Sequence, residues 1–291
     1  MLKMAIVVLA GCLALLPMVA SGFFPATLRV VNGLRGWVRV LLPAVLVAPY
    51  VMVACAYGVF EWRWFCVYAL LPVAIAATLE DARRVDKEQR GNWRDFLVVL
   101  VAGLAVDLRW LQPAWPPGLS AFNKVLLLDA GIYGFMALRQ LESVGYDLRM
   151  RWRDVLVGLR EFWFYAPLGA GLGLWMGFLH FHAAWPRPGQ ALGAFAFTFA
   201  LIAIPEELFF RGWMQNLLER RLGRTGALIT ASAVFGLAHF NKLTAHFNWR
   251  YVILAVLAGI FYGRAWRAER RVGASAITHA CVDTTWSLFL H

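Results

Sequence analysis

Apolar residues along this chain come in runs of 15–20 positions, and short arginine-rich connections separate the runs. Runs of this length are long enough to cross the hydrocarbon core of a bilayer as helices. Strands are disfavoured, because the strands of a membrane barrel alternate apolar and polar positions. The fold class predicted is all-α, a polytopic helical integral membrane protein with about 8–10 transmembrane helices. The predicted spans are about 40–60, 64–79, 96–111, 121–138, 163–181, 191–210, 226–240, 251–263 and 273–290.

The amino end adds a further apolar run, residues 4–20, which follows Lys3. This run could be a signal peptide cleaved near Ala20-Ser21-Gly22 or a retained first helix, and the sequence leaves both readings open. Composition agrees with a membrane protein. Hydrophobic residues make up 61% of the 291 positions and charged residues only 15%, whereas a soluble domain carries about 25% charged residues.

The net charge of +11 is distributed along the chain as membrane topology requires. Alternate connections hold 20 of the 28 Lys and Arg residues, and the connections between them hold six. The basic set comprises residues 22–39, 80–95, 139–161, 212–225 and 264–271. Since Lys and Arg accumulate in cytoplasmic loops, these connections are predicted to be cytoplasmic, in a bacterial inner membrane. The lipid bilayer is the expected partner of this charge, and nucleic-acid binding is not expected. Residues 148–162 are predicted to form an amphipathic elbow in the headgroup region, or else an ordinary connection.

Ionisable residues interrupt the apolar run that contains Pro205, at Glu206, Glu207 and Arg211. Each costs about 2.5–3.5 kcal/mol in hydrocarbon, so together they indicate a functional site. Glu207 and Arg211 are four residues apart, in the order that favours an ion pair on one helix face. Glu206 is rotated by about 100° from Glu207 and is expected to face a cavity, as a general base does. The alternative is a structural ion pair with one carboxylate reaching the interface.

Two later interruptions have the same character. His239 lies near the end of a predicted span and shares a helix face with Phe235, four residues earlier. His279 and Asp283 are also four apart, so both can point into one cavity, where Asp283 could orient His279 or share a proton with it.

These three pieces, Glu206-Glu207-x-x-x-Arg211, Phe235-x-x-x-His239 and His279-x-x-x-Asp283, resemble in order the motifs of the CAAX protease and bacteriocin-processing (CPBP) family. That family consists of intramembrane endopeptidases and includes the Ras-converting CAAX endopeptidase. The resemblance covers about 160–290. It predicts a protease core at residues 161–291, preceded by transmembrane helices of unassigned role at residues 1–160. Asp283 stands where the family usually has Asn.

The resemblance implies that Glu206 and His239 activate a water molecule, that Glu207 with Arg211 supports the site, and that His279 with Asp283 stabilises the tetrahedral intermediate. No cofactor is expected. The sequence lacks a His-Glu-x-x-His motif, which favours a metal-free glutamic mechanism. If the enzyme is instead zinc-dependent, Glu206, His239 and His279 are the expected ligands.

The predicted function is hydrolysis of a peptide bond in a membrane-anchored protein or peptide, as in the processing of a carboxy-terminal tail or a sorting signal. Two alternatives remain. The same carboxylates and histidines could serve a proton-coupled transporter, or the chain could be a catalytically silent scaffold or immunity protein of the same family. The sequence does not indicate an oligomeric state.

Overall fold

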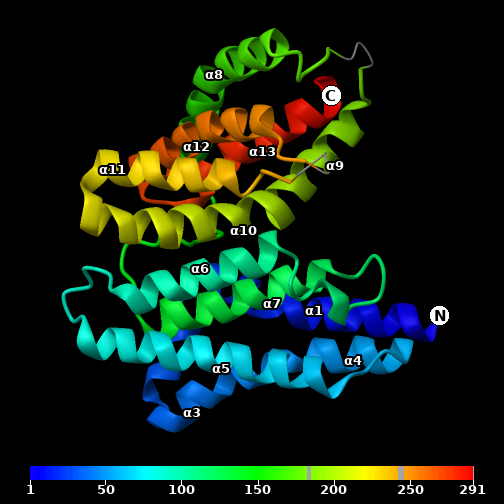
Figure 1. Cartoon of the computed structure of the whole chain (residues 1–291), viewed down its shortest axis with the longest axis vertical. Coiled ribbons are helices and arrows are strands. Elements are labelled where there is room, and N and C mark those ends of the chain that lie inside the picture. Colours follow the sequence, from blue (N-terminus) through cyan, green and yellow to red (C-terminus); the bar gives the residue numbers. More distant parts are fainter. Residues whose placement is uncertain (182–184, 242–245, 291) are drawn as a thin grey trace. The chain divides into compact units, whose positions relative to one another are not determined.

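The computed structural model describes residues 1–181, 185–241 and 246–290, and this part of the chain contains helices and turns but no strand (Figure 1). The all-α prediction is confirmed. Six helical segments of the described residues are long and apolar enough to cross a membrane. They are Leu2–Phe23, Gly36–Tyr57, Trp62–Val85, Ala121–Leu138, Pro188–Leu237 and Trp249–Glu269. The chain is therefore a polytopic, helical integral membrane protein.

The chain divides into two compact units, Met1–Glu142 and Ser143–His291. The predicted boundary after residue 160 falls inside a helix of the second unit. The first unit contains α1 (Leu2–Phe23), α2 (Ala26–Val30), η1 (Val31–Gly33), α3 (Gly36–Leu41), η2 (Leu42–Val47), α4 (Ala48–Tyr57), α5 (Trp62–Val85), α6 (Trp93–Asp107), η3 (Gln112–Ala114), α7 (Ala121–Ile132) and η4 (Tyr133–Leu138). The second contains α8 (Trp152–Trp175), α9 (Pro188–Thr198), η5 (Phe199–Ala203), α10 (Ile204–Glu207), η6 (Leu208–Gln215), α11 (Asn216–Leu237), α12 (Trp249–Glu269) and α13 (Val272–Phe289).

Two stretches of the second half that were expected to connect membrane spans are themselves largely helical. Residues 152–162 of the elbow expected at 148–162 form the first half of α8, and their position in the headgroup region stays a prediction. Asp154 caps this helix, accepting a hydrogen bond from the backbone nitrogen of Arg151 at 2.9 Å. The connection expected at 212–225 is also helical, except that Gly223 has φ +69° and ψ 176°. At Gly223 the chain reverses, so that α11 runs back beside the helices that precede it (Figure 1).

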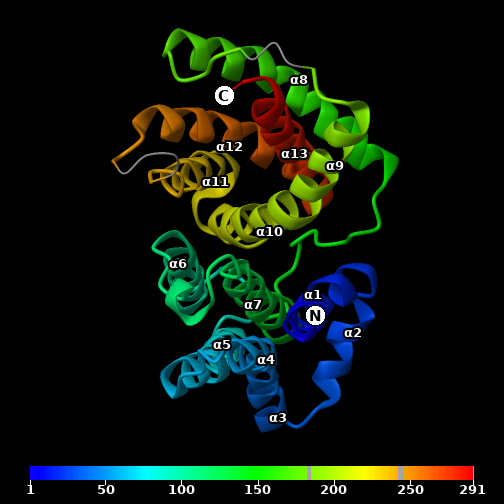
Figure 2. The same ribbon diagram turned by 90° about the vertical axis from the view of Figure 1, so that its right-hand side faces the viewer.

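Helix α13 lies at the centre of the second unit, with α8, α12 and the α9–η5 segment packed around it (Figure 2). Small residues allow the close contacts. A Cβ at Gly158 of α8 would overlap Ile277 of α13, and one at Gly236 of α11 would overlap Val256 of α12. Packing of this kind, in which small residues let helix backbones approach, is typical of membrane helices. It gives α13 a fixed position among the helices that carry the other polar residues.

A buried ion-pair network attaches the segment before α8 to the turn between α12 and α13. Arg271 donates through Nε to both carboxylate oxygens of Asp154 at 2.9 Å, and through Nη1 to Asp147 at 3.2 Å. The side chain of Asp154 is fully buried. Hydrogen bonds from Arg149, followed by those from Arg271, hold the pKa of the Asp147 carboxyl well below its usual range. The network therefore fixes the start of α8 against α13.

Replacing Arg271 with alanine is expected to lower the free energy of unfolding by about 3–5 kcal/mol, because it leaves the Asp154 carboxylate buried without its cation. Thermal and denaturant unfolding of the purified protein in detergent measures this loss. Arg153→Ala, at an exposed position one residue before Asp154, is the matched control and is expected to unfold like the wild type. Equal stability of the two variants would contradict this role of Arg271.

Candidate active site

Glu206 and Glu207 lie on α10, a single α-helical turn between two π-helical stretches, η5 and η6. Pro205 stands in the first turn of α10, and the helical path continues through it. π-Helical turns are rare and are frequently found at functional sites. Here they change the angular spacing of the side chains on both sides of the two carboxylates.

Glu207 is fully buried and is held by three side chains. The Nε of Arg211 donates to its Oε2 at 3.0 Å, Nδ1 of His279 lies 2.9 Å from its Oε1, and the Ser275 hydroxyl also donates to Oε2. The ion pair predicted from the four-residue spacing is therefore present. Arg211 is itself fully buried and lies over the ring of Phe235, 5.2 Å from the centroid. Glu207 thus links α10 to α13 and fixes one side of the His279 ring.

The other ring nitrogen of His279 faces two further carboxylates. Nε2 lies 3.3 Å from Oδ2 of Asp283 and 3.9 Å from Oε2 of Glu206. The imidazole stacks on Tyr262, with 4.6 Å between ring centroids and 15° between the planes. Because Nδ1 and Nε2 both face carboxylate oxygens, an imidazolium at this position could donate hydrogen bonds from both atoms. His279 is the residue that brings the first and third motifs together.

His239 lies just beyond the end of α11 and is 6% exposed. Its Nδ1 lies 2.8 Å from the carbonyl oxygen of Phe235. A proton on Nδ1 would be donated to that carbonyl, which leaves Nε2 as the acceptor nitrogen of the neutral ring. Phe235 also contacts His279 edge-on, with 5.8 Å between centroids, so one aromatic ring packs against both histidines.

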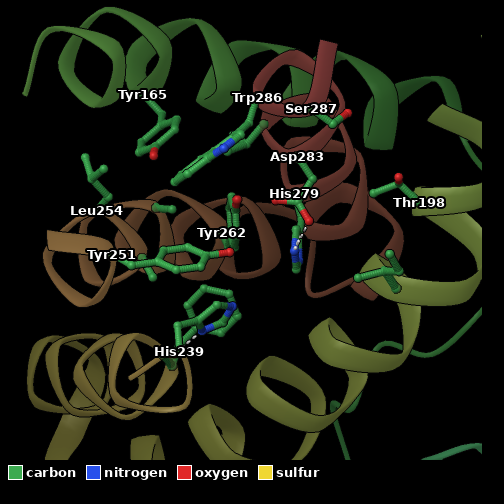
Figure 3. Close-up of a pocket in the computed structure, with 15 residues that line it drawn as sticks. Tyr165, Thr198, His239, Tyr251, Leu254, Tyr262, His279, Asp283, Trp286 and Ser287 are labelled. Atoms are coloured by element: carbon green, nitrogen blue, oxygen red, sulfur yellow. Dashed lines mark hydrogen bonds and ion pairs between the residues drawn. The ribbon is translucent and has the colours of Figure 1, made fainter. Parts of the chain in front are cut away.

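A cavity of about 250 Å³ lies beside these residues (Figure 3). His239, His279 and Asp283 line it. Its remaining wall is mostly aromatic and apolar, and includes Tyr165, Thr198, Ile202, Phe235, Tyr251, Leu254, Tyr262, Val282 and Trp286. In Figure 3 the tyrosines lie across the cavity from Thr198. Glu206 stands beside the cavity instead of in its lining, with its side chain 25% exposed and its carboxylate next to His279. The cavity wall is thus mostly aromatic and apolar, and the motif residues His239, His279 and Asp283 form part of it.

Glu206, His239 and His279 are the residues expected to bind zinc if the enzyme is zinc-dependent. Among the residues that the structure describes, no three His, Cys, Asp or Glu side chains are arranged to hold a metal ion. His279 has Nδ1 on Glu207 and Nε2 towards Asp283, so a ligating nitrogen would have to leave one of these partners. The present arrangement does not fit a zinc site, and a metal-free mechanism stays a prediction.

Several residues of the site were not expected from the sequence. Ser275 lies four residues before His279, and Gln215, which accepts from Arg211 at 3.5 Å, lies four residues after Arg211. The same spacing that revealed the motif pairs could have found both. The sequence spacing does not reveal the three tyrosines of the cavity, Tyr165 of α8 and Tyr251 and Tyr262 of α12. Only the packing of α8, α12 and α13 brings them to the cavity.

Residues 188–285 match the family model described as "Rce1-like: Type II CAAX prenyl endopeptidase Rce1-like". This segment is Rce1-like. The match begins at the first residue of α9, ends inside α13 and includes all the residues of the three motifs. The family resemblance predicted from those motifs is confirmed over these residues, and the family is one of CAAX-type membrane proteases. Comparisons with curated proteins and with solved structures found no match. The Rce1-like segment thus includes the helices that carry the motifs but not α8.

Proposed function

We propose that this protein is an intramembrane endopeptidase that hydrolyses a peptide bond in a membrane-anchored protein or peptide. The observation that carries the proposal is the position of His279 within the Rce1-like segment. It lies between the buried Glu207 on one side and Glu206 with Asp283 on the other, at the end of an apolar cavity. Such a cluster of ionisable groups at membrane depth indicates function more than stability.

In the proposed reaction, Glu206 accepts a proton from a water molecule, and His239 helps to orient that water through Nε2. The water oxygen then attacks the carbonyl carbon of the scissile bond. A hydrogen bond from Nε2 of His279 stabilises the oxyanion of the tetrahedral intermediate, an effect of about 2.7–4 kcal/mol for one well-placed donor. Glu206 returns its proton to the nitrogen of the leaving amine as the C–N bond breaks, so the protons balance over one turnover.

Glu207 acts through His279 in this scheme. With Arg211 and Ser275 it holds Nδ1 of the ring, so that Nε2 faces Asp283 and Glu206. In the proposed step Nε2 donates to the oxyanion in place of Asp283. Preorganised donors stabilise developing charge without reorganisation during the reaction, which is why a fully buried, multiply bonded carboxylate suits this position. Glu207 and Arg211 are therefore positioning residues, and Glu206, His239 and His279 are proposed to contact the reacting atoms.

The apolar cavity suits a substrate segment that has already partitioned into the bilayer. Its lining offers mostly aromatic and apolar surface for a side chain next to the scissile bond, together with a few polar groups that could orient the substrate. The proposal includes a bacterial inner membrane as the location, with the arginine-rich connections cytoplasmic. Processing of a carboxy-terminal tail or a sorting signal fits such a site.

The test uses the purified full-length protein in proteoliposomes with a library of membrane-anchored peptides, and mass spectrometry identifies the products. New peptide ends that are absent with Glu206→Gln and unchanged by a chelator would support a metal-free protease. Cleavage that a chelator stops and zinc restores would show metal dependence, and would require rearrangement of Glu206, His239 and His279. A folded wild type that cleaves nothing would favour the transporter or scaffold alternative.

Asp283 provides a separate prediction. Asp283→Asn keeps the size of the side chain and its position 3.3 Å from His279, but removes the negative charge. If Asp283 only orients the ring through a hydrogen bond, kcat should stay within about threefold of the wild-type value, and Asp283→Ala should lower it by about tenfold or more. Steady-state cleavage of one identified peptide by the three proteins measures this. An inactive, folded Asp283→Asn variant would show that the carboxylate charge is required.

A further inference from the structure

A second cavity, of about 370 Å³, lies in the first unit and is rich in cations. It is formed by the carboxyl end of α5, the connection that follows, and the residues after η4. Its lining residues are Arg83, Arg84, Asp86, Lys87, Gln89, Arg139 and Gln140. None of them belongs to the Rce1-like segment or to the proposed catalytic site.

Ion pairs and hydrogen bonds hold the residues at the base of this cavity in place. Arg139 is fully buried, with its Nε on Oδ1 of Asp95 at 2.8 Å and its Nη2 on Oδ2 of Asp86 at 2.6 Å. Gln89 closes another side, because its Nε2 donates to the carbonyl oxygen of Gln140 at 3.0 Å and its Oε1 accepts from the backbone of Glu142. The cavity is therefore held by hydrogen bonds and ion pairs between three segments, and the side chains of Arg139 and Asp95 are fully buried.

The remaining cations are poorly neutralised. Glu80 is shared by Arg39 at 2.7 Å, Arg83 at 3.1 Å and Arg84 at 3.4 Å. The whole group has five cations, Arg39, Arg83, Arg84, Lys87 and Arg139, and three carboxylates, Glu80, Asp86 and Asp95, which leaves two positive charges in excess. The neighbouring pairs Arg90–Glu88 and Arg94–Asp81 add no net charge. An anion with one or two negative charges would balance the cluster.

The segments that end at the cavity indicate the kind of anion. Two segments that can cross the membrane, Trp62–Val85 and Ala121–Leu138, both end at the cavity. Large apolar side chains are exposed at the nearby helix ends, since Val85, the last residue of α5, is 62% exposed and Trp93, the first residue of α6, is 65% exposed. Trp93 also packs against the guanidinium of Arg94 at 4.7 Å. Exposed tryptophan and arginine at the end of a span are typical of the headgroup level of a bilayer.

We propose that this cavity binds the phosphate group of an anionic membrane phospholipid. Arg84 and Lys87 supply the exposed positive charge, while Arg83 and Arg139 define the shape of the cavity. Basic residues immediately outside the hydrocarbon attract anionic lipid, and guanidinium groups match the geometry of phosphate oxygens. The acyl chains of such a lipid would lie along the exposed faces of the two spans that end here.

The test measures thermal unfolding of the purified full-length protein in neutral detergent while phosphatidylglycerol, phosphatidylcholine or inorganic phosphate is added. Native mass spectrometry counts the bound lipid in parallel. The test variant is Arg84→Gln with Lys87→Gln, two exposed positions whose replacement leaves the Arg139 ion pairs in place. The matched control is Arg29→Gln with Arg35→Gln, which removes the same charge from exposed positions of the same unit.

Phosphatidylglycerol is expected to stabilise the wild type and the control at the same concentration, and phosphatidylcholine is expected to have little effect. The test variant should need roughly tenfold more phosphatidylglycerol for half of the shift, since two nearby cations are lost. Equal titrations of the test variant and the wild type would overturn the proposal, as would equal stabilisation by both lipids or by neither. Stabilisation of the wild type by inorganic phosphate alone, lost in the test variant, would overturn the lipid assignment and leave a site for free phosphate.

Discussion

Glu206→Gln is expected to abolish peptide hydrolysis and to leave the fold intact. The amide keeps the shape of the carboxylate but cannot accept the proton of the attacking water, and loss of a general base typically lowers kcat by about two to four orders of magnitude. The fold should survive because the Glu206 side chain is 25% exposed and is not one of the groups that bind Glu207. Initial rates on an identified peptide, together with the thermal midpoint, measure both effects.

The control for Glu206→Gln is Glu61→Gln. Glu61 is another carboxylate of the same chain, with a 47% exposed side chain that pairs with the exposed Arg63. Its variant removes the same charge and is expected to cleave at the wild-type rate. A folded Glu206→Gln protein with full activity would remove Glu206 from the mechanism, and the alternatives of a transporter or a scaffold would gain weight.

Arg211→Ala is expected to lower stability and activity together. Arg211 and Glu207 are both fully buried, so the variant leaves a carboxylate in a poorly solvated position without its guanidinium. Breaking a buried pair in this way costs about 3–5 kcal/mol. The variant should give a lower yield and a lower unfolding midpoint, and cleavage should fall because Glu207 no longer holds His279 in place.

A double variant separates charge from packing at this pair. If the unpaired charge causes the instability, Arg211→Ala combined with Glu207→Gln should unfold less readily than Arg211→Ala alone, although both should be poor enzymes. Arg250→Ala, at an exposed position near the start of α12, is the control for arginine removal in general. A normal yield and unfolding midpoint for Arg211→Ala would contradict the structural role of the pair.

Helix periodicity explains which parts of the site could be predicted from the sequence. Residues four apart lie on one face whatever the helix packs against, so the Glu207–Arg211 pair and the proximity of His279 to Asp283 were both expected and are both present. The contact of His279 with Glu207 could not be expected in the same way. It joins residues 72 positions apart and depends on how α10 packs against α13.

The hydropathy pattern likewise predicts only part of the fold. It located α7 with η4 at the predicted bounds and the starts of α5 and α12 within two residues. Both α5 and α12 continue six residues beyond the predicted ends, through charged residues that hydropathy excludes from a span. It missed the helical path of residues 212–222, where Glu219, Arg220 and Arg221 raise the polarity and lead up to the reversal at Gly223. It also did not show that residues 152–162 join the next segment in one continuous helix, because local charge cannot show that Asp154 is neutralised by Arg271, far along the chain.

The π-helical stretches η5 and η6 each let the chain hold an extra residue beside the site without rotating the flanking helices. A π-helical turn accommodates more residues than the 3.6 of an α-helical turn. Removing one residue from 199–203 would therefore allow an ordinary α-helix to form, at little cost to backbone hydrogen bonding. Because the wide turn absorbs the extra residue, Glu206 and Glu207 would keep nearly the same direction relative to α9. Single-residue deletions within 199–203 should thus preserve cleavage far better than deletions within α9, where no wide turn absorbs the change and the two carboxylates would rotate by about 100°.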